Sequence, residues 1–155
     1  MTAAGLGAPA LAKKRRAKPA PALVDRVIGD GWTFRQANDG DWLPATVPGT
    51  VHTDLLANGK IADPFYRTNE RDQQWIDKKD WEYRTTLTLD ARTCARQHVE
   101  LVFEGLDTYA EVYLNDTLVL QADNMFRTWT ADIKAHVKPG ANALRIAFAR
   151  RSPRA

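Results

Sequence analysis

The stretch Trp81–Leu89, with the sequence WEYRTTLTL, decides the fold class of this chain. Its even-numbered positions hold Glu, Arg and Thr, and its odd-numbered positions form one face that carries Trp81, Tyr83, Thr85, Leu87 and Leu89. Successive side chains of a β-strand point to opposite faces. The alternation therefore predicts a strand with one buried side and one side that faces water.

The same period of two returns further along the chain. Asn115-Asp116 is a typical hairpin turn, and apolar residues alternate in residues 99–103, 110–114, 118–120 and 144–148. No long helical pattern separates these segments, which favours an antiparallel β-sandwich or jelly roll. Sandwiches of this kind use about eight strands, whereas the sequence provides about six or seven. We therefore expect a sandwich that is incomplete at its C-terminal end, with its last strand, 144–148, short of neighbours.

One short helix and one long loop are predicted before the first long strand. Thr50 can cap a helix over residues 51–57, and Asn58-Gly59 supplies its stop. Residues 60–80 are polar and irregular, and a structureless stretch of this length predicts a functional or docking loop. Trp75 lies in this loop, and its sequence context fits packing and sugar contact equally. Aromatic side chains serve both purposes, but core or inter-domain packing is favoured at three strand positions, Trp32, Trp81 and Trp129.

The basic residues are concentrated at the two ends of the chain. Residues 1–20 contain five Lys or Arg and residues 150–155 contain three, so acidic residues outnumber basic ones in between although the net charge is +3. We predict a disordered, basic, Ala/Pro-rich tail at residues 1–24, a sandwich domain at 25–149 and a basic end at 150–155. Basic tails can bind nucleic acid. No aromatic residues are interleaved with these charges, so a solvated extension is favoured and no nucleic-acid partner is expected.

The sequence pattern provides no membrane span and no intrachain disulfide. No run of 18 apolar residues occurs, and Cys94 is the single cysteine. The weakly apolar residues 5–12 precede the basic cluster, which is the reverse of the order in a signal peptide. The localisation is therefore open between cytoplasm and periplasm.

The residues alone predict no catalytic site, metal site or cofactor. Two carboxylate pairs lie close in sequence: Asp77 with Asp80, and Glu100 with Glu104. Glycoside hydrolysis needs two carboxyls facing each other across a cleft, and a solvated surface suits these pairs better. The histidines lack the spacing of a zinc site: His52, His98 and His136. Motifs for phosphate, dinucleotide or serine-hydrolase chemistry are absent from the sequence.

Five segments match one enzyme family in order and spacing. They are residues 42–56 (WLPATVPGTVHTDLL), 63–70 (DPFYRTNE), 80–85 (DWEYRT), 103–115 (FEGLDTYAEVYLN) and 124–129 (NMFRTW). Together they resemble the N-terminal domain of β-mannosidases in glycoside hydrolase family 2, and the resemblance covers residues 30–149. It implies a galactose-binding-like jelly roll, which agrees with the alternating pattern.

The resemblance also implies partners and a site. In the family an immunoglobulin-like domain and a (β/α)₈ barrel follow, and two glutamates of the barrel hydrolyse terminal β-D-mannosides with retention. This sequence has no counterpart of those glutamates, so we expect the chain to be inactive alone. The segment 124–129 corresponds to a loop that approaches the active site of related enzymes. We predict Asn124 as a pocket-facing residue with Arg127 behind it; a turn-stabilising role for the Asn124 side chain is the alternative.

Three functions follow from these observations. The first is a domain of a β-mannosidase-like enzyme, which helps to wall the substrate site. The second is a stand-alone carbohydrate-binding module, which titration with mannose would distinguish. The third is a structural or nucleic-acid-binding protein that works through its tails, which a salt-sensitive DNA shift would reveal.

Overall fold

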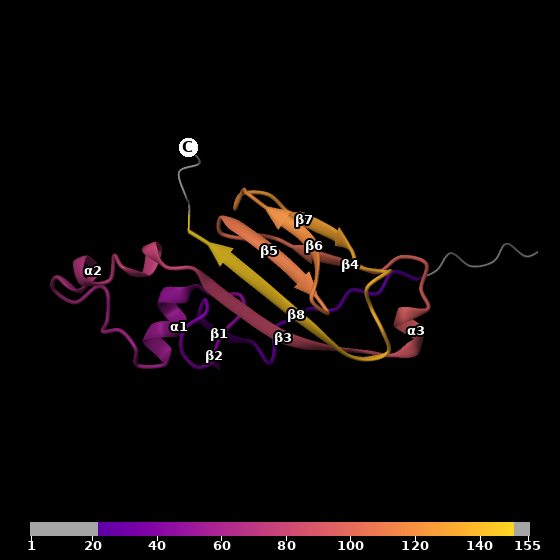
Figure 1. Cartoon of the computed structure of the whole chain (residues 1–155), viewed down its shortest axis with the longest axis horizontal. Coiled ribbons are helices and arrows are strands. Elements are labelled where there is room, and N and C mark those ends of the chain that lie inside the picture. The colour runs from indigo at the N-terminus through magenta and orange to yellow at the C-terminus, as the bar shows by residue number, and fades with distance from the viewer. Residues whose placement is uncertain (1–21, 151–155) are drawn as a thin grey trace, which may run out of the picture.

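The computed structural model describes residues 22–150 and places them in two antiparallel β-sheets (Figure 1). The larger sheet of this described part has the order β2 (Leu43–Pro44), β1 (Thr33–Gln36), β3 (Trp81–Leu89), β8 (Gly140–Ala149), β5 (Tyr109–Leu114) and β6 (Thr117–Ala122). The smaller sheet pairs β4 (Glu100–Phe103) with β7 (Trp129–Asp132). The predicted all-β sandwich is therefore confirmed.

Strands β3 and β8 form the centre of the larger sheet. They pair along their whole length, from Trp81 opposite Phe148 to Leu89 opposite Gly140. On its other side β8 pairs with β5, and Leu114 lies opposite Leu144. The expectation that residues 144–148 lack neighbours is wrong, because the last strand inserts between two earlier ones instead of lying at an edge.

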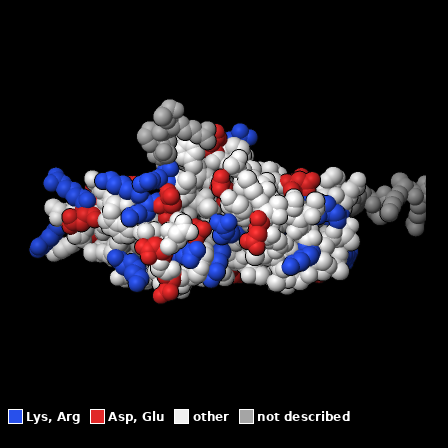
Figure 2. All heavy atoms as spheres, viewed as in Figure 1, with Lys and Arg blue, Asp and Glu red and all other residues white. Residues whose placement is uncertain are grey.

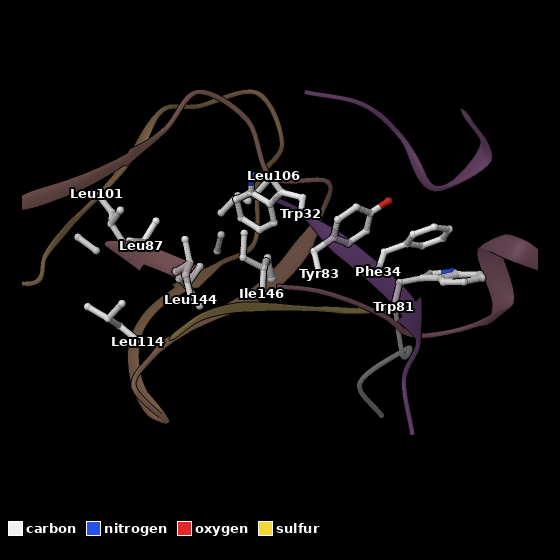
Figure 3. Close-up of a cluster of buried hydrophobic side chains, with 14 of the residues drawn as sticks. Trp32, Phe34, Trp81, Tyr83, Leu87, Leu101, Leu106, Leu114, Leu144 and Ile146 are labelled. Atoms are coloured by element: carbon white, nitrogen blue, oxygen red, sulfur yellow. The ribbon is translucent and has the colours of Figure 1, made fainter. Parts of the chain in front are cut away.

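The buried side chains have an aromatic end and an aliphatic end (Figure 3). Phe34 stacks on Tyr83 with ring centroids 5.5 Å apart, and Trp81 lies 6.1 Å from Phe34. The aliphatic end is built from Leu87, Leu101, Leu114 and Leu144. Along β3 the odd positions through Leu87 are buried, as the alternation predicts, and each large apolar side chain buried in this way contributes about 1.5–3 kcal/mol.

Helix α1 (Val51–Ala57) begins and ends where the sequence predicts. The Thr50 hydroxyl accepts a 3.2 Å hydrogen bond from the backbone N–H of Thr53, and the Thr53 hydroxyl accepts one of 3.0 Å from the N–H of Thr50. This reciprocal pair is a capping box. Gly59, with φ of 65°, adopts the left-handed conformation just beyond the helix.

Residues 60–80 are more ordered than the sequence suggests. They contain helix α2 (Asn69–Asp72) and the 3₁₀ helix η1 (Ile76–Lys78), and Ile76 is fully buried. The prediction of a structureless loop is therefore wrong in this part of the segment.

Helix α3 (Ala91–Cys94) was also not predicted; the Asp90 carboxylate caps it by accepting a 2.7 Å hydrogen bond from the N–H of Thr93.

The hairpin between β5 and β6 turns at Asn115 and Asp116, as predicted. Their φ angles of 48° and 66° are both positive, which is the conformation that a two-residue type I′ turn requires.

The predicted basic ends fall mostly outside the described residues. Residues 1–21 and 151–155 are not described, so the tail at 1–24 and the end at 150–155 stay predictions. From Ala22 the chain runs without regular structure, and the Ala22 carbonyl accepts a 2.9 Å hydrogen bond from Arg96. Between residues 22 and 150, no helix has the length and apolarity needed to cross a membrane.

Candidate functional site

The candidate site is a hollow at one end of the larger sheet, where β5 begins and β6 and β8 end. Residues 104–108 and residues 123–128 form two loops that meet there, and the Thr108 hydroxyl lies 4.0 Å from the sulfur of Met125. Leu106 is buried and anchors the first loop in the core. The hollow has a volume of about 400 Å³ and is lined by Thr108, Tyr109, Asp123, Asn124, Met125, Phe126 and Ala149. A volume of this order suits a small ligand.

Asn124 lines this hollow and also shapes the second loop. Its side-chain oxygen accepts a 2.8 Å hydrogen bond from the N–H of Phe126, which makes a local Asx turn. Its backbone carbonyl accepts a 2.9 Å hydrogen bond from the indole N–H of Trp129. Within residues 22–150 the amide nitrogen of Asn124 makes no hydrogen bond, so it is free to donate. The pocket-facing and turn-stabilising roles are therefore compatible, and the predicted pocket role stays a prediction.

Arg127 does not line the hollow. Its guanidinium lies over the Trp129 ring, 4.1 Å from the ring centroid. This stacking holds Arg127 beside the base of the loop, which fits a position behind Asn124. Its predicted position behind Asn124 also stays a prediction.

Several aromatic side chains that could stack on a sugar are covered on one face by other groups, whereas Phe65 is 97% exposed. Guanidiniums lie over Trp42, Tyr66, Tyr113 and Trp129. Trp75 packs against Trp81 at 6.2 Å, and Trp32 and Trp81 are buried in the core, as predicted. Phe126, at the tip of the loop that borders the hollow, is 89% exposed.

The carboxylates and histidines named from the sequence do not gather into a site. Glu100 and Glu104 are exposed on either side of the exposed Val102. Asp80 accepts a 2.7 Å hydrogen bond from the N–H of Arg150, the last described residue. In the described part of the chain, no three His, Cys, Asp or Glu side chains form a group that could hold a metal ion. Figure 2 shows acidic and basic side chains interspersed over the end of the molecule that carries α1 and α2.

Sequence reasoning missed two buried acids. Asp54 is 1% exposed and accepts a 2.8 Å hydrogen bond from the Tyr83 hydroxyl. Burial, together with the hydrogen bond to Asp54, raises the pKa of Tyr83 well above its usual range. Glu82 is buried on the opposite side of β3, where it bridges Arg35 and Arg145. Asp54 lies at helical spacing among apolar residues, and this placement is the signal that could have identified it.

Comparison with known proteins identifies the domain. A family model described as glycosyl hydrolase 2 galactose-binding domain-like matches residues 32–155. The chain belongs to this family. The predicted galactose-binding-like fold and the resemblance to family 2 are thereby confirmed.

The named relatives include β-mannosidases from distant organisms. β-Mannosidase B of Emericella nidulans is 40% identical over 132 residues, which cover 82% of this chain and 16% of the relative. The β-mannosidase of Mus musculus is 37% identical over 121 residues, which cover 78% of this chain and 14% of the relative. The chain thus spans about one seventh of the length of these curated relatives.

Two solved structures share the fold. The β-D-mannosidase from Dictyoglomus thermophilum is 38% identical with a TM-score of 0.76, over 78% of this chain and 15% of that one. The exo-chitosanase of Amycolatopsis orientalis is 27% identical with a TM-score of 0.70, over 81% of this chain and 16% of that one.

Proposed function

We propose that this chain acts as the galactose-binding-like domain of a β-mannosidase, in which it forms one side of the substrate site beside a catalytic barrel. The barrel, preceded by an immunoglobulin-like domain, hydrolyses terminal β-D-mannosides with retention of configuration. The domain contributes the loop 123–128 to the mouth of that site. Asn124 faces the sugar there, and Phe126 packs against the neighbouring domain or the substrate.

The observation that carries the proposal is the loop 123–128 beside its hollow. Its sequence matches the family segment, its polar Asn124 lines the hollow, and its apolar tip is exposed in the described part of the chain. Phe126 lies next to Met125, which is also exposed, and contiguous exposed apolar side chains mark a contact surface more often than scattered single ones. The names of the relatives support the β-mannosidase context, because the fungal and mammalian sequences are both about equally similar to this chain.

The test is a domain exchange. Residues 25–149 replace the equivalent domain of the Dictyoglomus thermophilum β-D-mannosidase, and hydrolysis of an aryl β-mannoside is measured. We expect kcat/KM within about tenfold of the parent enzyme, because a matching wall keeps the substrate oriented. The unfused chain, assayed at the same concentration, serves as the blank.

The matched control places the same residues in the exo-chitosanase of Amycolatopsis orientalis, assayed on an aryl β-glucosaminide. Its lower identity predicts a poorly fitting interface and a loss of about a hundredfold or more in kcat/KM. If the exo-chitosanase chimera is the active one, or if a cooperatively folded mannosidase chimera is inactive, the proposed function is wrong.

A further inference from the structure

The face of the larger sheet opposite the core carries two arginines side by side. Arg84 of β3 lies directly opposite Arg145 of β8 in the strand register, and both alternate with buried residues of the core face. Like charges directly opposite each other on neighbouring strands destabilise a sheet. This arrangement at the centre of the sheet therefore calls for a compensating anion.

The chain supplies only part of that compensation. Both carboxylate oxygens of the buried Glu82 are engaged, one by Arg35 at 2.8 Å and the other by Arg145 at 3.1 Å. Within residues 22–150, Arg84 forms no ion pair, and its polar side-chain contact is a 3.4 Å hydrogen bond to the Thr33 hydroxyl. Most of the donors of Arg84 therefore lack an acceptor from the described chain.

Two aromatic rings hold the guanidiniums in place. Arg84 lies 3.9 Å from the centroid of the Trp42 ring, and Arg145 lies 4.2 Å from that of Tyr113. Stacking fixes the plane of each guanidinium. The Nη groups of Arg84, which make no hydrogen bond to the residues that the structure describes, can then form a bidentate bond to a carboxylate.

A hollow of about 720 Å³ lies over these side chains. Its lining includes Arg35, Arg84, Arg145 and the acidic Asp116. Glu82 pairs with Arg35 and Arg145, and Glu111 also acts on Arg145, so in the described part of the chain Arg84 carries the charge that remains uncompensated. Trp42 and Tyr113 also contribute to the lining. The hollow is larger than a single oxyanion needs, and ligand sites of a few hundred Å³ hold drug-sized molecules.

We propose that this hollow binds an acidic peptide segment, with one Asp or Glu carboxylate held between Arg84 and Arg145. The guanidinium of Arg84, which has no ion pair within residues 22–150, is complementary to a carboxylate of such a segment. The curated relatives are several times longer than this chain, so a parent polypeptide offers ample sequence that can supply the segment. The inference goes beyond the proposed function and does not depend on the sugar that the parent enzyme cleaves.

The test uses the full 155-residue chain and NMR signals of the arginine Nε–H groups. The probe is acetyl-Gly-Glu-Gly-Glu-Gly-amide, and the matched neutral probe has Gln in place of both Glu. We expect saturable shifts of the Arg84 and Arg145 signals with the Glu peptide, and affinity at least about tenfold weaker with the Gln peptide. Arg84→Gln should weaken binding of the Glu peptide about tenfold. Arg84→Lys should weaken it less, because lysine keeps the positive charge but cannot form the bidentate hydrogen bonds of a guanidinium.

The basic residues outside the hollow also attract acidic peptides. Arg92→Gln is therefore the control for the loss of one positive charge away from the hollow. Arg92 is exposed on α3, and its loss should leave binding unchanged. Equal binding of the Gln peptide, or unchanged binding by Arg84→Gln, overturns the proposal. Sodium acetate that binds as tightly as the Glu peptide at equal ionic strength also overturns it, because the site then accepts any small anion. The comparison of the two peptides on the unmodified chain stands even if a variant fails to fold.

Discussion

The Tyr83 phenol donates a 2.8 Å hydrogen bond to the carboxylate of Asp54 in the interior of the molecule. The other carboxylate oxygen of Asp54 accepts a 2.8 Å hydrogen bond from the backbone N–H of Thr46. One buried acid therefore ties together helix α1, strand β3 and the segment that leads into the helix. Its two oxygens depend on donors that are distant in sequence.

Substitution of either partner should destabilise the domain. Tyr83→Phe leaves one buried oxygen of Asp54 without its donor and should lower the free energy of unfolding by about 1–3 kcal/mol. Asp54→Ala should cost more, because both the Tyr83 hydroxyl and the Thr46 N–H lose their acceptor. Urea unfolding followed by tryptophan fluorescence measures both changes. The control is Tyr66→Phe at an exposed phenol, expected within about 0.5 kcal/mol of wild type; a loss as small for Tyr83→Phe would contradict this assignment.

The raised pKa of Tyr83 predicts a specific loss of stability in alkali. The folded state favours the protonated phenol, so this stabilisation is complete below the ordinary tyrosine pKa of about 10 and is lost as the pH rises above it. We expect the free energy of unfolding to fall more steeply with pH above about 10 in the wild type than in Tyr83→Phe. Urea titrations at several alkaline pH values provide the two slopes. Parallel slopes would show that Tyr83 does not ionise on unfolding.

Asn142 is a second buried polar residue with a large predicted effect. It is fully buried, and its amide nitrogen donates to the carbonyls of Lys138 and Gly140 at 2.7 and 3.1 Å. Its oxygen accepts 2.9 Å hydrogen bonds from the N–H of Lys138 and the side chain of Asn115. Asn142→Ala should therefore cost at least about 2 kcal/mol, because several buried groups lose their partners together. Asn58→Ala, at the half-buried C-terminal cap of α1, is the control and should cost less, because the Asn58 side chain makes two hydrogen bonds, to the carbonyls of Pro44 and Asp54. Equal losses would mean that water replaces the Asn142 contacts.

The sequence predicts the strands well because their signal is local. Trp81, Tyr83 and Leu87 reveal the core face of β3 through alternation alone. The position of β8 between β3 and β5 was not predicted, because its pairing with each of these strands depends on contacts that are distant in sequence. The helical spacing of Asp54 could have shown its burial, but its donor Tyr83, 29 residues away, could not be predicted from the sequence. Asn124 was found through a matching segment, and the structure adds the hollow that it borders.

The cation-covered aromatic rings predict weak sugar binding by the chain alone. Trp42 and Trp129 each face a guanidinium, which competes with a sugar for the ring. We expect the dissociation constant for mannose to be weaker than about 1 mM. Isothermal calorimetry with mannose and manno-oligosaccharides provides the value. A constant near about 10 μM, or roughly −7 kcal/mol, would favour the stand-alone carbohydrate-binding module instead.

The two roles of Asn124 are separable because they use different atoms. The turn needs the side-chain oxygen, which accepts from Phe126, whereas contact with a substrate needs the free amide nitrogen. Asn124→Asp keeps the acceptor and removes the donor, and Asn124→Ala removes both. Asn124→Ser adds no charge and keeps a hydroxyl that both accepts and donates, but on a shorter side chain that does not reach as far as the amide nitrogen.

In the mannosidase chimera, we expect all three variants to lower kcat/KM on an aryl β-mannoside by about tenfold or more, as loss of one hydrogen bond to a substrate predicts. Thermal unfolding separates the turn from the pocket, since Asn124→Asp and Asn124→Ser should melt closer to the wild type than Asn124→Ala. Arg127→Ala is the matched control in the same loop, because Arg127 stacks on Trp129 and does not line the hollow. Its effect should be larger on the melting temperature than on kcat/KM. If Asn124→Asp and Asn124→Ser keep full activity while Asn124→Ala alone loses it together with stability, Asn124 only stabilises the turn and its assignment to the substrate site is wrong.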